Sequence, residues 1–332
     1  MPYEAGLLLF LTIQAEDFML NVSKKVPMEP DFTNYYCNDC PRKCNALRTP
    51  ENGAGVCGCP SLIRIARAAP HFGEEPCISG SKGSGAIFFE GCNLKCIFCQ
   101  NYEISRSAKR SAGRTVEELR SIILKLQDSG VHNINLVTPT HYSRQIAEAL
   151  SGITLHIPVV WNSSAYESVE TLRNLDGLVQ IYMPDYKYAS SETAKKYSAA
   201  PDYPETAAAA IKEMYRQTGP YVMCDDGLLK SGVLIRHLIL PGSDKNTSNS
   251  MNVIDFVADE LPLGSVLFSL MSQYTPMPAS AKYPELTGRL DCETAELLKH
   301  YMKTRRLEDG YYQDVESATT EMIPQWDGTG VQ

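Results

Sequence analysis

Three closely spaced cysteines, Cys92, Cys96 and Cys99, follow directly after an apolar run at 86–89. Their C-x3-C-x2-C spacing places three thiolates on one short loop, where they can hold three irons of a cubane [4Fe–4S] cluster. A fourth cysteine at a matching distance is missing, because the chain continues with Gln100. One iron would keep an open coordination position, as chemistry at a cluster needs, whereas electron-transfer clusters usually have every iron capped by protein.

A zinc knuckle or a set of buried thiols is the alternative interpretation of this loop. Zinc sites normally take a fourth cysteine or histidine from close by. The nearest histidines, His71 and His132, lie well outside the loop. The pattern therefore favours an iron–sulfur cluster, whose three cysteine ligands would be the centre of catalysis.

A second group of cysteines precedes the first. Cys37, Cys40, Cys44 and Cys57 have C-x2-C-x3-C-x12-C spacing, which can supply four ligands to one metal. A structural zinc and a second, fully capped iron–sulfur cluster both fit this pattern, and unliganded thiols in a mobile segment are the alternative. Cys59 is a spare thiol that could replace Cys57 as a ligand.

The elements that must position these residues follow a regular alternation. Thr115 and Glu118 have the spacing of a capping box that opens a helix ending before Gly130. Further helical patterns cover 144–150, 167–174, 205–217, 250–260 and 292–306, and short apolar runs that predict strands cover 86–90, 134–137, 157–161, 178–183, 233–240 and 266–270. Strands that alternate with helices predict parallel β/α units. Six units predict an α/β fold of the partial, open (β/α)6 TIM-like type.

In β/α barrels the functional residues gather at the carboxyl ends of the strands. The first predicted strand ends in the three-cysteine loop, and each later strand ends in small hydroxyl, amide or charged residues. Asp185 and Lys187 are two residues apart, so a regular strand would place both on one side. There they could bind one polar ligand or merely pair with each other. The strand-end residues that we take as candidates are Thr138, Thr140, Asn162, Ser163, Asp185, Lys187, Arg236 and Gln273.

The alternatives for single residues are structural. Thr138 and Thr140 could cap the following helix, and Arg236 could be an ordinary exposed side chain. Glu74 and Glu75 lie in a stretch bounded by glycine and proline, which favours an exposed turn.

We predict an N-terminal extension at 1–36, a Cys-rich metal-binding segment with a linker at 37–84, and the barrel at 85–332.

Composition limits the possible functions. The chain has 332 residues, 43% of them hydrophobic, and a net charge of −8 without a long basic block. It therefore lacks the electrostatic footprint of a nucleic-acid-binding protein. The apolar run at 6–13 is too short to span a bilayer and lacks the basic start of a signal peptide. Cysteines at metal-ligand spacing, rather than in a disulfide framework, favour a reducing cytoplasm and no membrane association.

The three-cysteine spacing, with Phe98 just before the last cysteine, resembles the radical S-adenosylmethionine (radical SAM) superfamily. Asp185-Tyr186-Lys187 and the stretch 236–242 resemble the pyruvate formate-lyase activating enzymes. More narrowly, the stretches 40–42, 71–80, 91–102 and 138–141 resemble the PflX-type branch of that group. The resemblance covers the chain from about residue 35 to about residue 330.

This resemblance implies a [4Fe–4S] cluster on the three-cysteine loop and SAM as co-substrate, bound at the open iron. It implies that Phe98 lies by the adenine, that Asn162 and Ser163 contact the ribose or carboxylate, and that Asp185 and Lys187 lie near SAM. Arg236 and Gln273 are further candidates for cofactor binding. A reducing partner such as flavodoxin or ferredoxin is implied as well, together with a glycyl radical enzyme as target.

Two departures from the activating enzymes concern the target. Thr138-Pro139-Thr140 stands where activating enzymes usually carry Gly-Gly-Glu, so hydroxyls or backbone carbonyls would hold the SAM amine. The Cys-rich segment precedes the barrel instead of following the cluster loop. The alternatives are therefore radical SAM modification of another peptide or a small molecule, and, from a different class, a non-catalytic iron–sulfur or zinc protein.

Overall fold

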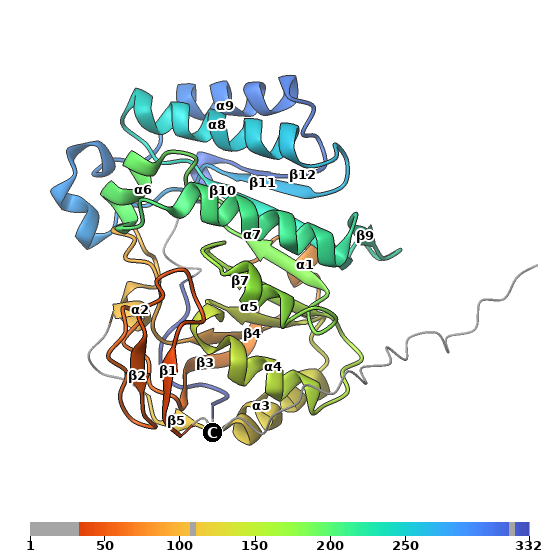
Figure 1. Ribbon diagram of the computed structural model, residues 1–332. Coiled ribbons are helices and arrows are strands. Elements are labelled where there is room, and N and C mark those ends of the chain that lie inside the picture. The colour runs from red at the N-terminus through yellow and green to blue at the C-terminus, as the bar shows by residue number, and fades with distance from the viewer. Residues whose placement is uncertain (1–32, 107–110, 319–322, 332) are drawn as a thin grey trace, which may run out of the picture.

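The computed structural model describes residues 33–106, 111–318 and 323–331. Six parallel strands form its centre, and they match the six predicted apolar runs: β4 (Ser84–Phe89), β6 (Ile134–Val137), β7 (Val159–Ser163), β8 (Ile181–Pro184), β10 (Leu229–Leu238) and β11 (Leu267–Met271). Each pairs in parallel with the next in chain order. The prediction of an α/β fold with a parallel sheet is confirmed, and the open sheet is consistent with a partial TIM-like barrel (Figure 1).

The sheet extends beyond the six predicted strands at both edges. β12 (Gly310–Gln313) adds a parallel strand beside β11. At the other edge β3 (Ile63–His71) pairs antiparallel with β4, and the short β5 (Gly113–Arg114) pairs with β3. The linker expected within 37–84 is in part a strand, because residues 63–71 belong to the main sheet. A short hairpin strand, β9 (Val222–Met223), pairs with β10.

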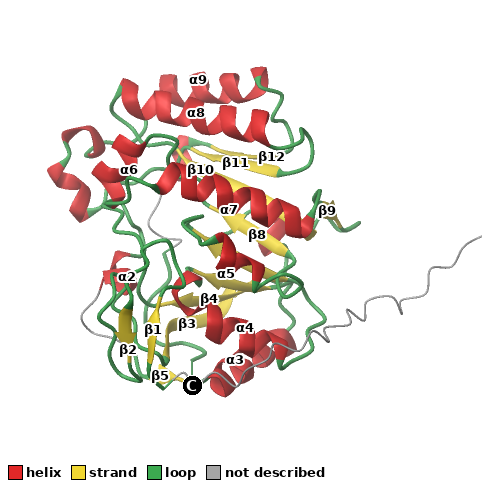
Figure 2. Ribbon diagram, viewed as in Figure 1, coloured by secondary structure: helices red, strands yellow, loops and turns green. Residues whose placement is uncertain are grey.

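Helices follow one another along the sheet (Figure 2). The capping box is confirmed: the Thr115 hydroxyl accepts a hydrogen bond from the Glu118 N–H, and the Glu118 carboxylate accepts one from the Thr115 N–H. The helices are α1 (Pro76–Ser79), α2 (Tyr102–Arg106), α3 (Val116–Asp128), α4 (Ser143–Ser151), α5 (Val169–Arg173), α6 (Ser191–Ser198), α7 (Tyr203–Thr218), α8 (Asp244–Glu260) and α9 (Cys292–Thr304), with 3₁₀ turns η1 (Thr140–Tyr142), η2 (Pro278–Lys282), η3 (Pro284–Leu286) and η4 (Val315–Ser317).

The strands separate two apolar layers, because successive side chains of a strand point to opposite faces. Trp161 belongs to the large cluster that includes the residues of the covering helices. Val160, its neighbour in β7, belongs to a second, smaller cluster with Ile181 and Leu234. The polar strand residues Asn162 and Arg236 follow on the same face as Val160 and Leu234, two residues further along each strand. That face therefore carries an apolar layer and, nearer the carboxyl ends, a polar one.

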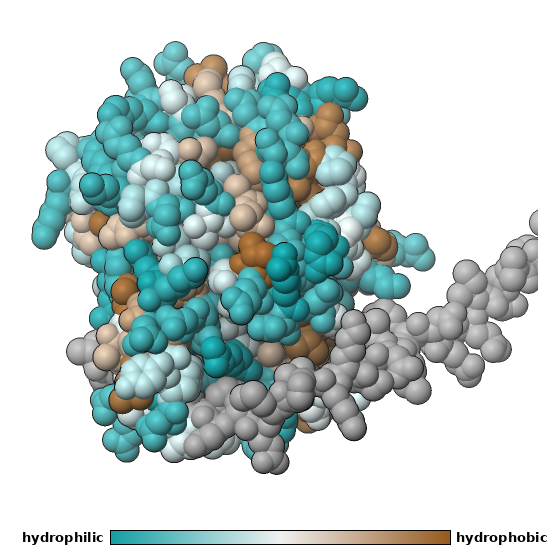
Figure 3. Space-filling model, viewed as in Figure 1, coloured by the Kyte–Doolittle hydropathy of each residue, from teal (hydrophilic) through white to brown (hydrophobic). Residues whose placement is uncertain are grey.

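A small antiparallel hairpin, β1 (Tyr35–Cys37) and β2 (Ala46–Arg48), lies beside the barrel near β3 and β5 (Figure 1). The predicted extension at 1–36, with its apolar run, falls outside the described residues except for its last four positions. The face of the molecule shown in Figure 3 is mostly hydrophilic, with small separate hydrophobic patches. Within the part of the chain that the structure describes, no helix has the length and apolar character to cross a membrane.

Candidate functional site

The loop after β4 brings Cys92, Cys96 and Cys99 together. Gly91 begins it with φ of 85°, and a Cβ at this position would overlap Sγ of Cys59, so the entry to the loop accepts only glycine. Burial, and next the negative charges of Cys96 and Cys99, raise the pKa of Cys92 to about 12. Three neighbouring, half-buried cysteine sulfurs are the donor set that a positively charged iron–sulfur core stabilises as thiolates.

Each of the three sulfurs has a polar neighbour. The backbone N–H of Leu94 donates to Sγ of Cys92 at 3.4 Å. The hydroxyl of Ser198 donates to Sγ of Cys96 at 2.9 Å, and Ser105 Oγ lies 3.6 Å from Sγ of Cys99. Hydrogen bonds to cluster sulfurs help to set the reduction potential. The loop therefore fits a [4Fe–4S] cluster in its surroundings as well as in its ligands.

A polar network, here called the Arg236 cluster, lies on the sheet face that also carries Val160 and Leu234. It consists of Arg236, Asp185, Glu74, Asn162 and Asn135. Arg236 donates from Nε to Asp185 (2.8 Å), from Nη1 to Glu74 (2.7 Å) and from Nη2 to the side-chain Oδ1 of Asn162 (2.8 Å). The side-chain amides of Asn162 and Asn135 each donate to Glu74 at 3.0 Å. Three other strands or loops are thus bonded to one guanidinium, and Asn135 of β6 joins the network through Glu74.

Lys187 connects this network to the cysteine loop. Its Nζ lies 2.7 Å from Asp185 Oδ2, so the predicted same-side arrangement of the two residues is present. Burial alone would raise the pKa of Asp185, but Arg236 and Lys187 bring it below its usual value. Burial raises the pKa of Cys96, and the charge of Lys187 opposes that rise. An ion-pair chain therefore runs from Lys187 through Asp185 to Arg236, and Lys187 is close enough to Cys96 to act on its thiol electrostatically.

Glu74, Glu75 and Asn135 are the residues that sequence reasoning missed. Glu75 lies 3.7 Å from Arg236, and its burial raises its pKa. The available signal was weak: Asn135 is a polar residue within a buried apolar strand, and the two glutamates stand side by side before a helix that begins with proline. The preference for an exposed turn at Glu74 and Glu75 is wrong, because both carboxylates face Arg236.

Phe98 is buried, with only 6% of its surface exposed. Its ring meets those of Tyr188 and Tyr274 edge-on, at centroid distances of 6.4 and 6.5 Å. An aromatic wall therefore stands directly beside Cys99. The expected contact of Phe98 with an adenine stays a prediction.

The side chains of three remaining candidates, Thr140, Ser163 and Gln273, form hydrogen bonds outside the Arg236 cluster. The Thr140 hydroxyl donates to buried Glu167 at 2.7 Å, and Ser163 Oγ accepts from the Ala165 N–H. Thr138 has φ of 58° and donates its N–H to the Asn162 carbonyl. Gln273 donates to Gln313 of β12. Their expected roles in cofactor binding stay predictions, and for Thr140 the hydroxyl is already engaged.

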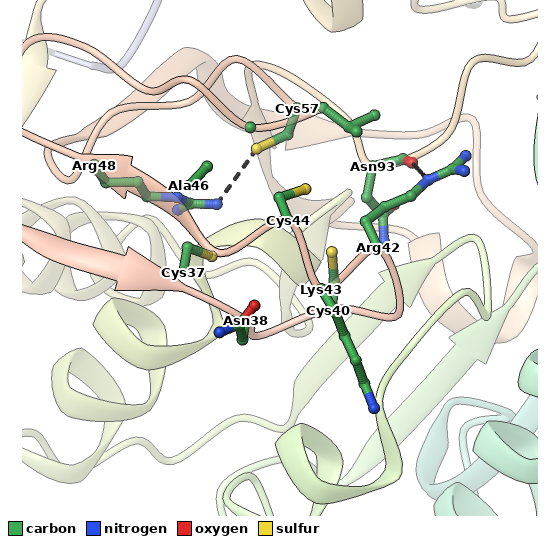
Figure 4. A pocket seen from close by; sticks show the side chains of 12 residues that line it. Cys37, Asn38, Cys40, Arg42, Lys43, Cys44, Ala46, Arg48, Cys57 and Asn93 are labelled. Atoms are coloured by element: carbon green, nitrogen blue, oxygen red, sulfur yellow. Dashed lines mark hydrogen bonds between the residues drawn. The ribbon is translucent and has the colours of Figure 1, made fainter.

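The second cysteine group also comes together. Cys37, Cys40, Cys44 and Cys57 line one pocket beside the β1–β2 hairpin, as Figure 4 shows. Cys59 does not line this pocket, although its Sγ lies 3.4 Å from the Cys57 carbonyl as well as 3.3 Å from the Glu90 carbonyl.

Comparison with known proteins agrees with this geometry. An open α/β barrel with three cysteines on the loop after its first parallel strand defines a class of iron–sulfur enzymes. Residues 86–229 match the family model described as "Radical SAM superfamily", and the chain belongs to this superfamily. It is 30% identical over 274 residues to the uncharacterized protein MJ0674 of Methanocaldococcus jannaschii, covering 78% of this chain and 72% of the relative.

Among solved structures, the chain is similar to Streptococcus suis SuiB bound to the precursor peptide SuiA, with a TM-score of 0.47 and 16% identity. The match covers 70% of this chain and 49% of SuiB, so the chain spans about half of that protein. It is also similar to HydG, a maturase of the [FeFe]-hydrogenase, with a TM-score of 0.47 and 14% identity over 67% of this chain and 49% of HydG. Membership of the superfamily implies an enzyme with a [4Fe–4S] cluster and SAM.

Proposed function

We propose that this radical SAM enzyme uses a [4Fe–4S] cluster on Cys92, Cys96 and Cys99 to cleave SAM reductively and that it activates a glycyl radical enzyme. The observation that supports the proposal most strongly is the ion-pair chain of Lys187, Asp185 and Arg236, whose lysine acts electrostatically on Cys96 of the three-cysteine loop. These charged side chains support a binding site for a charged co-substrate beside the iron that the polypeptide would leave open.

When bound, the reduced cluster supplies the electron that splits SAM into methionine and a 5′-deoxyadenosyl radical, which abstracts hydrogen from the substrate. The protein's residues bind and orient. SAM carries an ammonium, a carboxylate and a sulfonium, so its site needs acceptors and donors together. Asp185 and Glu74 offer acceptors, while Lys187 and Arg236 offer donors.

Water must be kept from such a site, because a reactive intermediate would otherwise be lost to side reactions. Phe98, Tyr188 and Tyr274 form an apolar, buried wall beside the cysteine loop. Because these three rings are buried and pack against one another, each has a fixed orientation. A fixed wall of this kind can hold a co-substrate in one position.

The choice of a glycyl radical enzyme as target rests on the resemblance of Asp185-Tyr186-Lys187 and of the stretch 236–242 to the pyruvate formate-lyase activating enzymes, with the PflX-type branch as the nearest pattern. A reducing partner such as flavodoxin or ferredoxin would deliver the electron, and the cytoplasm would be the compartment. Thr138-Pro139-Thr140 favours the second candidate, modification of another peptide or a small molecule, because it departs from the Gly-Gly-Glu of the activating enzymes.

Electron paramagnetic resonance decides between the two candidates. Reduced protein is mixed anaerobically with SAM and a glycyl radical enzyme encoded next to it. We expect a glycyl radical doublet that requires SAM and is absent with the Cys96→Ala variant. If SAM is consumed but no glycyl radical forms on any such partner, the activating role is wrong and the second candidate takes its place.

A further inference from the structure

We propose that Cys37, Cys40, Cys44 and Cys57 form a second, four-thiolate metal centre, which holds a thiophilic metal as zinc or as an iron–sulfur cluster. The four residues line one pocket, and Figure 4 shows their side chains arranged around the same space. Four thiolates are the usual donor set of structural zinc and of capped clusters. The argument for this centre does not depend on the proposed SAM chemistry.

The β1–β2 hairpin holds the first three thiols in place. Cys37 is the last residue of β1, and β2 begins two residues after Cys44. Between them, Asn38 and Asn45 close the loop through two side-chain hydrogen bonds, an amide-to-amide bond of 3.1 Å and one of 2.9 Å from the Asn45 N–H. Residues Lys43 and Asn45 adopt φ of 41° and 47° in this loop. The loop is therefore a built structure and not a loose connection.

The chain after β2 folds back so that Cys57, and not Cys59, completes the set. The Ser61 N–H donates to the Thr49 carbonyl at 2.8 Å, and the Gly58 N–H to the Gly55 carbonyl at 2.9 Å. Cys57 lines the pocket and Cys59 does not: the Sγ of Cys59 lies near the carbonyls of Glu90 and Cys57 and packs against Gly91. The structure thus assigns different positions to two thiols that the spacing alone could not distinguish.

A buried cation beside the pocket gives the second argument. Arg48 is only 3% exposed, and its acceptors within the described residues are Cys57 Sγ (3.3 Å), Tyr35 Oη (3.2 Å) and the His141 carbonyl. None of these is a carboxylate, although a buried charge is expected to be paired. A four-thiolate centre carries net negative charge, and it would supply the anion that Arg48 needs.

The pocket also adjoins the first cysteine loop. Arg42 donates from Nε to the Asn93 carbonyl at 2.8 Å and from Nη1 to the Ala199 carbonyl at 2.7 Å. Asn93 lines the pocket and directly follows Cys92. A metal that fixes the hairpin would therefore also fix Arg42 and, through it, the loop that carries the SAM-cleaving cluster.

Zinc and a cluster would use the same ligands in different geometries. Within residues 33–106, 111–318 and 323–331, no three Cys, His, Asp or Glu side chains stand in single-ion geometry. Zinc would draw the four sulfurs in to about 2.3 Å from one ion, whereas a cluster would fill more of the space between them. Metal analysis separates the two, since a cluster brings inorganic sulfide.

The test starts from a chain in which Cys92, Cys96 and Cys99 are alanine, so the outcome does not depend on the proposed function. Zinc, iron and acid-labile sulfide are measured on anaerobically purified protein. We expect about one zinc, or about two to four irons with matching sulfide, per chain. Adding Cys37→Ala and Cys40→Ala should remove this metal. Equal metal contents in the two proteins would overturn the proposal.

A matched pair in the otherwise unchanged chain guards against loss of folding in the multiple variants. Cys57→Ser should lose the second metal, whereas Cys59→Ser, two residues away, should keep it. The iron on the SAM-cleaving loop is the internal control for folding in both. If Cys59→Ser loses as much metal as Cys57→Ser, or if neither loses any, the ligand assignment is wrong.

Discussion

The hydroxyl of Ser198 lies 2.9 Å from Sγ of Cys96, although 102 residues separate the two in the chain. Ser198 is the last residue of α6, and the Tyr188 hydroxyl lies 2.7 Å from its Oγ. This contact connects α6, the helix that follows β8, to the cysteine loop that follows β4. It also places a hydrogen-bond donor on one of the three proposed iron ligands.

Replacing Ser198 by alanine should lower the reduction potential of the cluster. A hydrogen bond to sulfur favours the reduced, more negative state, so its loss should shift the potential down by roughly tens of millivolts. Redox titration followed by electron paramagnetic resonance measures the shift, with iron content expected to stay unchanged. Ser191→Ala, on the exposed start of the same helix, is the control, and an equal potential in all three proteins would contradict the assignment.

Asp185→Asn should weaken SAM binding while leaving the cluster intact. The substitution removes the negative charge that both Lys187 and Arg236 contact. Loss of one charged hydrogen-bonding partner should cost about 1.5–3 kcal/mol, or roughly ten- to a hundredfold in affinity. Equilibrium dialysis with labelled SAM measures this. Asp176→Asn, on the surface, should bind like the native protein; if the two variants bind SAM equally well, Asp185 does not lie at the SAM site.

Arg236→Met should destabilise the fold strongly. Glu74 and Glu75 would then remain buried without their shared cation, and breaking such a buried pair costs about 3–5 kcal/mol. Urea denaturation at pH 7 measures the free energy of unfolding. Lys212→Met removes the solvent-exposed ion pair with Glu260 and should change this free energy far less. Similar losses in both variants would contradict a buried network.

Stability should fall as the pH drops from about 6.5 toward 4. Burial lowers the pKa of His237 to about 4, whereas an unfolded histidine titrates near 6.5. The unfolded state therefore binds more protons within this window, so the contribution of neutral His237 is complete above pH 6.5 and is lost below it. Denaturation at pH 7 and pH 5 should show a smaller decrease for His237→Gln than for the native chain. Equal decreases would mean that His237 titrates normally.

The parallel strands were predictable because strands buried on both faces form continuous apolar runs. β3 was missed since Arg64 and Arg67 interrupt its apolar residues, and both side chains reach the surface of an edge region. β12, with the sequence Gly-Tyr-Tyr-Gln, is only half buried and has no such run. Edge strands depend on their pairing partner, which local sequence does not encode.

Some residues of the candidate site were likewise predictable from the sequence, and others were not. Spacing predicted the three-cysteine loop, because its ligands must be close in sequence to share one short loop. The same-side placement of Asp185 and Lys187 followed from the period of a strand. The contact between Arg236 and Glu74 spans 162 residues. Such partners, like Ser198, become visible only once the strands have been brought side by side.

Reductive cleavage of SAM is the measurement that tests the central claim most directly. The protein is reconstituted anaerobically with iron and sulfide, reduced with dithionite, and incubated with SAM. We predict equal amounts of methionine and 5′-deoxyadenosine, and neither product from the Cys96→Ala variant. A protein that holds an intact [4Fe–4S] cluster, stays reduced and leaves SAM uncleaved would contradict the account.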